Sequence, residues 1–170
     1  LVSLRRPRDQ DEWNFIYVGT NPIDKSYITS LDNAFVFPLY LYTTPEDTAG
    51  TLFAQAETTR KANLSPAFLA ALSAKLGIPY VEGAAPLRPA AASPKFAANL
   101  GEDGWGSFGP EDVFYYAYAV FHSPTYRSRY AEFLKIDFPR LPLTGDRALF
   151  LTLAEKGRQL VSLHLLKTPL

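Results

Sequence analysis

Cysteine and methionine are both missing from this chain of 170 residues. The lack of cysteine excludes a disulfide scaffold, a thiolate metal site and a cysteine nucleophile, and it fits a reducing cytoplasm. The lack of methionine, even at position 1, predicts that the chain is a piece of a longer protein. No run approaches the roughly 18 apolar residues that a membrane-spanning helix needs, and Leu1–Arg8 has no signal-peptide pattern, so no membrane contact is expected.

An excess of either charge is also missing, because 17 Lys and Arg residues balance 17 Asp and Glu residues. A uniformly basic protein that coats nucleic acid is therefore excluded, whereas a local basic face is not. Hydrophobic residues make up 47% of the chain and charged residues 20%, which is typical of one globular domain with a sizeable core. The aromatic share of 14% predicts dense core packing or a surface that stacks on a flat partner.

The first part of the chain is predicted to form strands. Trp13–Val18 is aromatic and β-branched and stops at a turn cluster, and Lys25–Ser30 and Ala34–Tyr42 are two further short runs. Pro38 cannot donate to a strand ladder, so we expect an edge position or a bulge at this residue.

The later part is predicted to be helical, over residues 66–76, 110–122, 124–134 and 147–166. Ser65 and Asp146 are the expected N-caps, Gly77 ends the first helix, and Gly157 is expected to interrupt the last one. Between these helices, Gly83–Pro94 reads as an extended loop and Gly101–Gly109 as a mobile turn.

Aromatic residues in the 124–134 helix follow helical spacing. Tyr126, Tyr130 and Phe133 should be buried on one face, packing against the preceding helix. The order of elements predicts an α+β fold, with a small, mainly antiparallel sheet followed by a helical C-terminal half. We expect a single domain with a strand-rich part (1–62), a part with one helix and Pro/Ala/Gly-rich loops (63–108) and a helical part (109–170).

A self-contained active site is not apparent in the sequence. There is no phosphate-binding glycine loop, and His122 and His164 stand apart from each other and from carboxylates, so we expect no metal and no cofactor in this chain. His122 should cap carbonyls at a helix end, and His164 should be a core or boundary residue. The pair Glu111 and Asp112 fits the first turn of a helix better than acid–base chemistry. An independent enzyme, such as a small hydrolase, is therefore disfavoured.

Basic residues outnumber acidic residues after Thr125, by eight to four. A solvated helix face explains this excess, and contacts to nucleic-acid phosphates are the alternative. The phosphate candidates are Arg127, Arg129, Lys135, Arg140 and Arg147. Lys135, at a helix end, is the best of them, whereas Arg140 could instead clamp a carboxylate such as Asp137. Arg127 and Arg129 diverge on a helix and cannot both face one ligand.

One long string carries a family resemblance. Tyr116–Pro142 fits the pattern YxYAxxHSPxYRxxYxxFLKxDFPRxP, and FPLYLY, NLSP and LVSLHLL recur around it in the same order. The chain thereby resembles the C-terminal specificity region of large adenine-N6 DNA methyltransferases of the type ISP restriction–modification class. This resemblance implies a target-recognition domain that binds double-stranded DNA and follows a methyltransferase domain, sometimes with nuclease and helicase-like motor domains in the same polypeptide.

The chain departs from the complete enzyme in its catalytic motifs. The glycine motif for S-adenosylmethionine and the N-P-P-Y motif are absent, and Asn21–Asp24 does not replace the latter. S-adenosylmethionine is therefore implied for the parent enzyme only. The sequence also leaves open that the chain is a docking domain without direct DNA contact.

Residues that read DNA should lie between the family strings, because relatives must read different sequences on one frame. These segments are Thr43–Thr59 and Gly83–Phe108, although Gly83–Pro94 could equally be a linker. The candidate DNA contacts within them are Gln55, Arg88, Lys95, Asn99 and Trp105.

Overall fold

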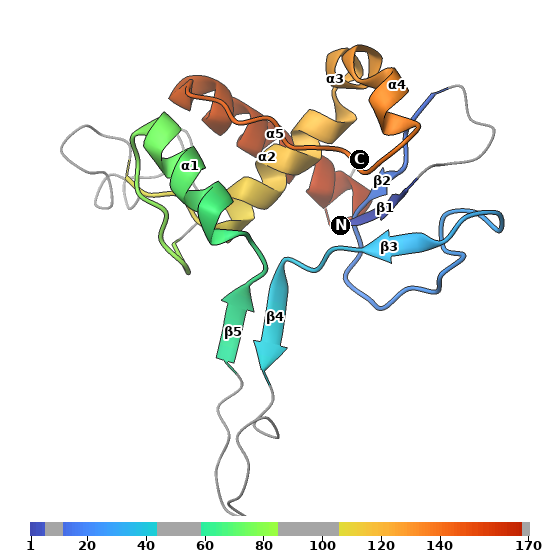
Figure 1. Cartoon of the computed structure of the whole chain (residues 1–170). Coiled ribbons are helices and arrows are strands. Elements are labelled where there is room, and N and C mark those ends of the chain that lie inside the picture. Colours follow the sequence, from blue (N-terminus) through green and yellow to red (C-terminus); the bar gives the residue numbers. More distant parts are fainter. Residues whose placement is uncertain (6–11, 44–58, 85–105, 168–170) are drawn as a thin grey trace, which may run out of the picture.

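Short strands precede the helices in the computed structural model, which describes residues 1–5, 12–43, 59–84 and 106–167 (Figure 1). This order confirms the predicted α+β class. The strands are β1 (Val2–Leu4), β2 (Ile16–Tyr17), β3 (Ala34–Val36), β4 (Tyr40–Thr43) and β5 (Thr59–Ala62). The helices are α1 (Pro66–Leu76), α2 (Pro110–His122), α3 (Pro124–Arg129), α4 (Ala131–Leu134) and α5 (Arg147–His164). No described helix is long and apolar enough to cross a membrane.

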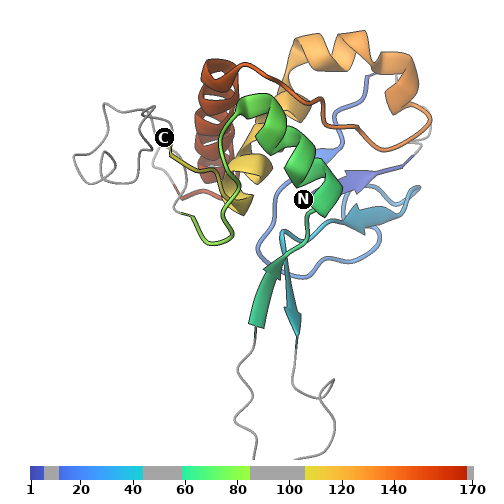
Figure 2. The ribbon, with the colours of Figure 1, turned by 60° about the vertical axis from the view of Figure 1, so that its left-hand side comes forward.

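The strands form two separate antiparallel sheets. One has the order β2-β1-β3, with Val2 opposite both Tyr17 and Val36. The other is a two-stranded ribbon of β4 and β5, in which Tyr40 pairs with Ala62. In both views this ribbon projects away from the helices and the three-stranded sheet (Figures 1 and 2).

Three strand predictions are corrected. Ala34–Tyr42 is not one strand, because the chain leaves the first sheet after Val36, passes Pro38, and enters the ribbon at Tyr40. Lys25–Ser30 forms turns rather than a strand. The carboxylate of Asp24 accepts a hydrogen bond from the Ser26 amide at 2.8 Å, so a local contact replaces strand pairing. Trp13–Val18 is a strand only at Ile16–Tyr17.

Helix α2 is the centre of the core. Tyr118 in α2 and Phe150 in α5 are fully buried, and the two helices pack closely along their length. Gly157 lies where they are closest, since a Cβ there would be 1.8 Å from the Tyr115 carbonyl oxygen. The expected interruption at Gly157 is wrong: α5 runs unbroken, and the glycine serves the close approach to α2.

Local helix signals are largely confirmed. Pro66 begins α1, and Gly77 ends it with a left-handed φ of 63°. The Asp146 carboxylate accepts from the Leu149 amide at 3.0 Å, and the Ser123 hydroxyl accepts from the Tyr126 amide at 3.4 Å. Ser65 occupies the N-cap position of α1 without a side-chain cap hydrogen bond.

The predicted 124–134 helix is divided. Its backbone turns at Tyr130, where φ is −110° and ψ is 17°, so α3 and α4 have different axes. Tyr126 is 7% exposed and donates to the Arg140 carbonyl oxygen at 2.8 Å, whereas Tyr130 is 39% exposed. Phe133 is half-buried. The prediction of one buried stripe is therefore correct for Tyr126 and wrong for Tyr130, because the break rotates it outward.

Candidate functional site

The five candidate DNA contacts between the family strings lie outside the described residues. They are Gln55, Arg88, Lys95, Asn99 and Trp105, and they remain predictions. The other five candidates, Arg127, Arg129, Lys135, Arg140 and Arg147, are described, and the structure gives each a specific environment.

Arg147 and Arg127 bind backbone carbonyls within the fold. The Arg147 guanidinium donates to the carbonyl oxygens of Leu76 and Gly77, the latter at 3.0 Å, where α1 ends. Arg127 donates from Nε to the Phe121 carbonyl oxygen at 2.8 Å, and burial lowers the pKa of its guanidinium. Arg127 still lines a pocket of about 490 Å³ with mixed polar and apolar walls beside Trp13, so solvent reaches it. Both cations join elements of the fold to each other.

Lys135 and Arg140 contact carboxylates. Lys135 Nζ lies 2.8 Å from Glu132 Oε1, in an exposed pair one helical turn apart. Arg140 Nη2 lies 3.9 Å from Asp137 Oδ2, and its guanidinium sits 4.8 Å from the centre of the Phe133 ring. Arg140 therefore makes the carboxylate contact that the sequence allowed. Such exposed pairs contribute little to stability and leave both cations able to exchange partners.

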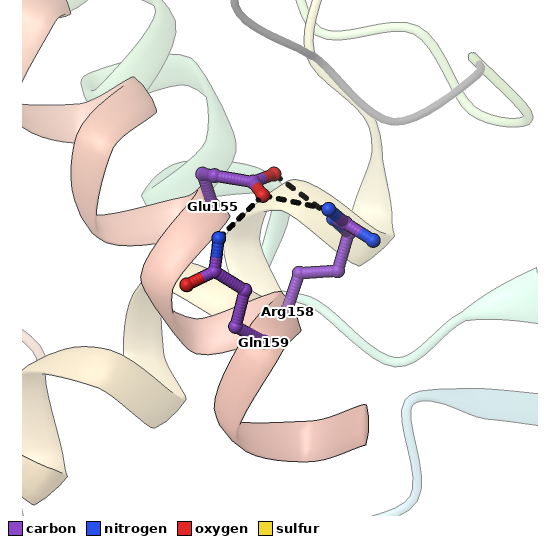
Figure 3. A network of polar contacts seen from close by, with 3 residues as sticks. All are labelled: Glu155, Arg158 and Gln159. Atoms are coloured by element: carbon purple, nitrogen blue, oxygen red, sulfur yellow. Dashed lines mark hydrogen bonds and ion pairs between the residues drawn. The ribbon is translucent and has the colours of Figure 1, made fainter. Parts of the chain in front are cut away.

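The basic excess of α5 is partly neutralised within the helix. Arg158 donates from Nη2 and Nε to the Glu155 carboxylate at 2.6 and 2.9 Å (Figure 3). Gln159 donates to the same carboxylate at 2.9 Å, and this hydrogen bond helps to fix the orientation of the Glu155 carboxylate. This arrangement makes Arg158 a surface ion-pair residue whose charge is matched by Glu155.

The two histidines are not isolated, contrary to the sequence-based expectation. The centres of the His122 and His164 rings are 5.4 Å apart, and Tyr118 lies against both. The Tyr118 hydroxyl and His164 Nδ1 are 2.6 Å apart. His122 Nδ1 lies 2.9 Å from the Tyr118 carbonyl oxygen, which confirms its carbonyl-capping role.

This Tyr118–His122–His164 cluster brings one phenol and two imidazole rings into contact. Within the described residues, no three His, Cys, Asp or Glu side chains could share a metal ion. Burial lowers the pKa of His122, and burial raises the pKa of Tyr118. Burial therefore favours the neutral forms of His122 and Tyr118, which form a tertiary contact between α2 and the end of α5.

The two predicted acids at the start of α2 have different roles. Asp112 is buried, and its Oδ2 accepts from the Gly109 amide at 2.9 Å, closing the N-terminus of the helix. Glu111 accepts a hydrogen bond from the Tyr40 hydroxyl at the base of the ribbon. This contact joins β4 to the rigid α2 helix.

The β4–β5 ribbon presents two cations that the sequence analysis did not select. Arg60 and Lys61 are both exposed on β5, and they lie beside the unmatched segment Thr43–Thr59. The Arg60 guanidinium lies 4.0 Å from the centre of the Tyr40 ring, in a cation–π contact. In the sequence, only the position of Arg60 and Lys61 next to Thr43–Thr59 could have pointed to these two cations.

An apolar groove lies near the base of the ribbon. It has a volume of about 350 Å³, and its walls come from the linkers of both ribbon strands and from α1 and α2. Its lining includes Leu1, Phe37, Leu39, Leu64, Phe68 and Phe114.

A compact helical body that projects an exposed, cationic two-stranded ribbon has the form of a recognition module. Residues 1–169 match the type ISP C-terminal specificity domain family, and the chain belongs to that family. Its role is accordingly target recognition in a type ISP restriction–modification enzyme. No curated protein and no solved structure matches the chain. The resemblance found in the sequence is thereby confirmed.

Proposed function

We propose that this chain is the DNA-recognition module of an adenine-N6 DNA methyltransferase in a bacterial restriction–modification enzyme. It binds double-stranded DNA in the cytoplasm and selects the sequence to be modified. A methyltransferase domain outside the chain flips the target adenine out of the stack and transfers the methyl group of S-adenosylmethionine to N6. This domain, with any motor and nuclease domains of the polypeptide, is its protein partner.

The projecting β4–β5 ribbon is the observation that carries this proposal. Its strands lead into and out of Thr43–Thr59, one of the segments predicted to read DNA, and they hold Arg60 and Lys61 in solvent. The intervening sequence contains Gln55 together with Glu46, Asp47 and Glu57. Amide and carboxylate groups pair with base edges, whereas carboxylates repel phosphates. This composition suits reading of bases better than nonspecific attachment to the backbone.

The salt dependence of binding tests the proposal. Cations that contact phosphates displace counterions, so affinity for duplex DNA should fall steeply as salt is raised. The measurement is fluorescence anisotropy of a labelled random-sequence duplex with the intact polypeptide between about 50 and 200 mM salt. A flat response would contradict DNA binding by this chain.

Exchange of segments between relatives tests whether this chain determines which DNA sequence is methylated. Replacing Thr43–Thr59 or Gly83–Phe108 by the corresponding segment of a relative should move the methylated sites to those of the relative. Sequencing that detects methylated adenine gives the outcome. Unchanged sites after both exchanges would show that the reading residues lie elsewhere.

The apolar groove favours a second function, in which the chain docks other domains of the enzyme without touching DNA. Phe37 in its lining and Phe35, two residues earlier, are 43% and 42% exposed and contact Phe138 edge-on. If the chain only docks other domains, Arg60→Ala and Lys61→Ala in the intact polypeptide should leave the salt dependence of DNA binding unchanged, which separates the two functions.

A further inference from the structure

We propose that the β4–β5 ribbon enters the major groove of duplex DNA and that Arg60 reads a guanine there. This inference rests on the proposed function, because it names the residue and the groove through which the chain would recognise DNA. Nothing in the sequence pattern selected Arg60; its role follows from its place in the structure.

The shape of the ribbon fits this groove. The major groove of B-DNA is about 12 Å wide and admits a two-stranded β-ribbon. Within the described residues, β4 and β5 pair only with each other, and Leu41 and Tyr42 are 48% and 62% exposed. The ribbon also stands away from the helices in both views (Figures 1 and 2), so the body would not collide with the DNA backbone before the ribbon enters.

The register of the ribbon separates its two faces. Tyr42 lies opposite Arg60, and Leu41 lies opposite Lys61. Directly paired residues of an antiparallel ribbon point to the same face, so Arg60 shares a face with Tyr42 and Tyr40. Lys61 points to the other face, where a flexible ammonium can reach a phosphate but meets no base edge.

Arg60 is held in place before any ligand arrives. Its guanidinium lies 4.0 Å from the centre of the Tyr40 ring, and the Tyr40 hydroxyl donates to the carboxylate of Glu111 in α2. A guanidinium stacked on a ring keeps its N–H donors free at its edge, in the fork that matches O6 and N7 of guanine. The contacts to Tyr40, and through it to α2, thus fix the plane of the Arg60 guanidinium. This reduces the conformational entropy that the side chain loses on binding.

Three arginines of the helical half are less suited to base reading than Arg60. Arg127 and Arg147 donate to backbone carbonyls of the fold, and Arg158 is engaged by Glu155. Arg60 makes no ion pair with any described residue, and its stacking contact does not use its donors.

Selection from a randomised duplex pool tests the inference. The intact polypeptide and its variants would each select sequences from the pool, which are then read by sequencing. The wild type should select a consensus that contains a guanine, and Arg60→Lys should lose the preference at that one position by about 10- to 100-fold while keeping the others. Lys156→Ala is the matched control, because it removes one exposed cation from α5 and should leave the consensus intact.

Lysine keeps the positive charge but lacks the planar pair of N–H donors of arginine. Arg60→Lys therefore distinguishes the reading of a base from a contact to phosphate. If Arg60→Lys retains the full consensus and Arg60→Ala merely weakens binding of every sequence alike, Arg60 contacts phosphate and the inference is wrong. If the wild type binds DNA with no consensus, or does not bind it, the proposed function itself fails. Thermal unfolding of both variants should match the wild type, because Arg60 is exposed.

Discussion

Arg147 is a side chain whose role depends on a partner 70 residues away in the sequence. Its guanidinium caps the C-terminus of α1, where carbonyl oxygens lack amide partners and the helix dipole favours a cation. It therefore stabilises the contact between α1 and the start of α5, and a contact to DNA phosphate would have to break this arrangement.

We expect Arg147→Ala to lower the free energy of unfolding by about 1–2 kcal/mol, because charged hydrogen bonds to partly buried carbonyls are lost. The slope of DNA affinity against salt should stay unchanged. Urea unfolding gives the first quantity and anisotropy titrations the second. Arg129→Ala is the control, since Arg129 is exposed and its guanidinium lies 6.0 Å from the centre of the Tyr130 ring, so its stability effect should be within about 0.5 kcal/mol. A reduced salt slope with unchanged stability would make Arg147 a phosphate contact.

Gly157 allows α2 and α5 to pack closely. In an open helix, replacing glycine by alanine is favourable by about 1 kcal/mol. Here the added Cβ would meet the Tyr115 carbonyl oxygen at 1.8 Å, so α2 and α5 would have to move apart. We expect Gly157→Ala to lower the free energy of unfolding by about 2–4 kcal/mol, measured by urea denaturation.

The control for this prediction is Gly19→Ala. An added Cβ at Gly19 would have no atom within 4 Å, so little change is expected. Equal stability of wild type and Gly157→Ala would mean that α2 and α5 are less closely packed than described.

At the scale of elements, the break between α3 and α4 decides which aromatic rings enter the core. Tyr126 contacts the ring of Phe121 at a centroid distance of 5.6 Å, and its hydroxyl donates a hydrogen bond to the Arg140 carbonyl oxygen. Tyr130 follows the break and lies largely outside. Similar residues at helical spacing therefore have different energetic roles.

We expect Tyr126→Ala to cost about 3–5 kcal/mol of stability, because it leaves a cavity in the core and removes the hydrogen bond to the Arg140 carbonyl oxygen. Tyr130→Ala should cost less than about 1 kcal/mol, as is usual at exposed positions. Chemical unfolding of the two variants side by side measures both values. Equal losses would show that α3 and α4 pack as one continuous helix, as the sequence pattern had suggested.

At the scale of the whole molecule, α2 and α5 bring His122 and His164 together across 42 residues of sequence. Burial is the main cause that lowers the pKa of His122 below its ordinary 6.5, with Arg127 and His164 adding to the effect. Below pH 6.5 the unfolded chain therefore binds more protons at this residue than the folded chain does.

The free energy of unfolding should consequently decrease as pH falls from about 7.5 to 5.5, with no contribution from His122 above that range. Thermal or urea unfolding at several pH values measures the slope. His122→Gln should reduce the slope, because glutamine does not titrate. An identical slope in wild type and variant would assign the pH dependence to other groups.

The sequence allowed prediction of those features that depend on neighbouring residues. Pro66, Gly77 and Asp146 act within one turn of their own position, so both ends of α1 and the start of α5 were predicted from local patterns. It did not predict the split of Ala34–Tyr42, because the two halves pair with strands distant in sequence. Burial of the predicted aromatic stripe also depended on a backbone turn at Tyr130 that its spacing does not reveal.

The sequence by itself determined the α+β class, most helix ends and the family, because these follow from local backbone preferences and from an ordered string of side chains. Only the tertiary structure decided which cations remain available. Arg127 and Arg147 are bound by carbonyls of other elements, whereas Arg60 is stacked on Tyr40 and faces solvent. The physical reason is that a charge alone does not specify its partner: packing brings distant groups within hydrogen-bond range of some cations and leaves others facing solvent.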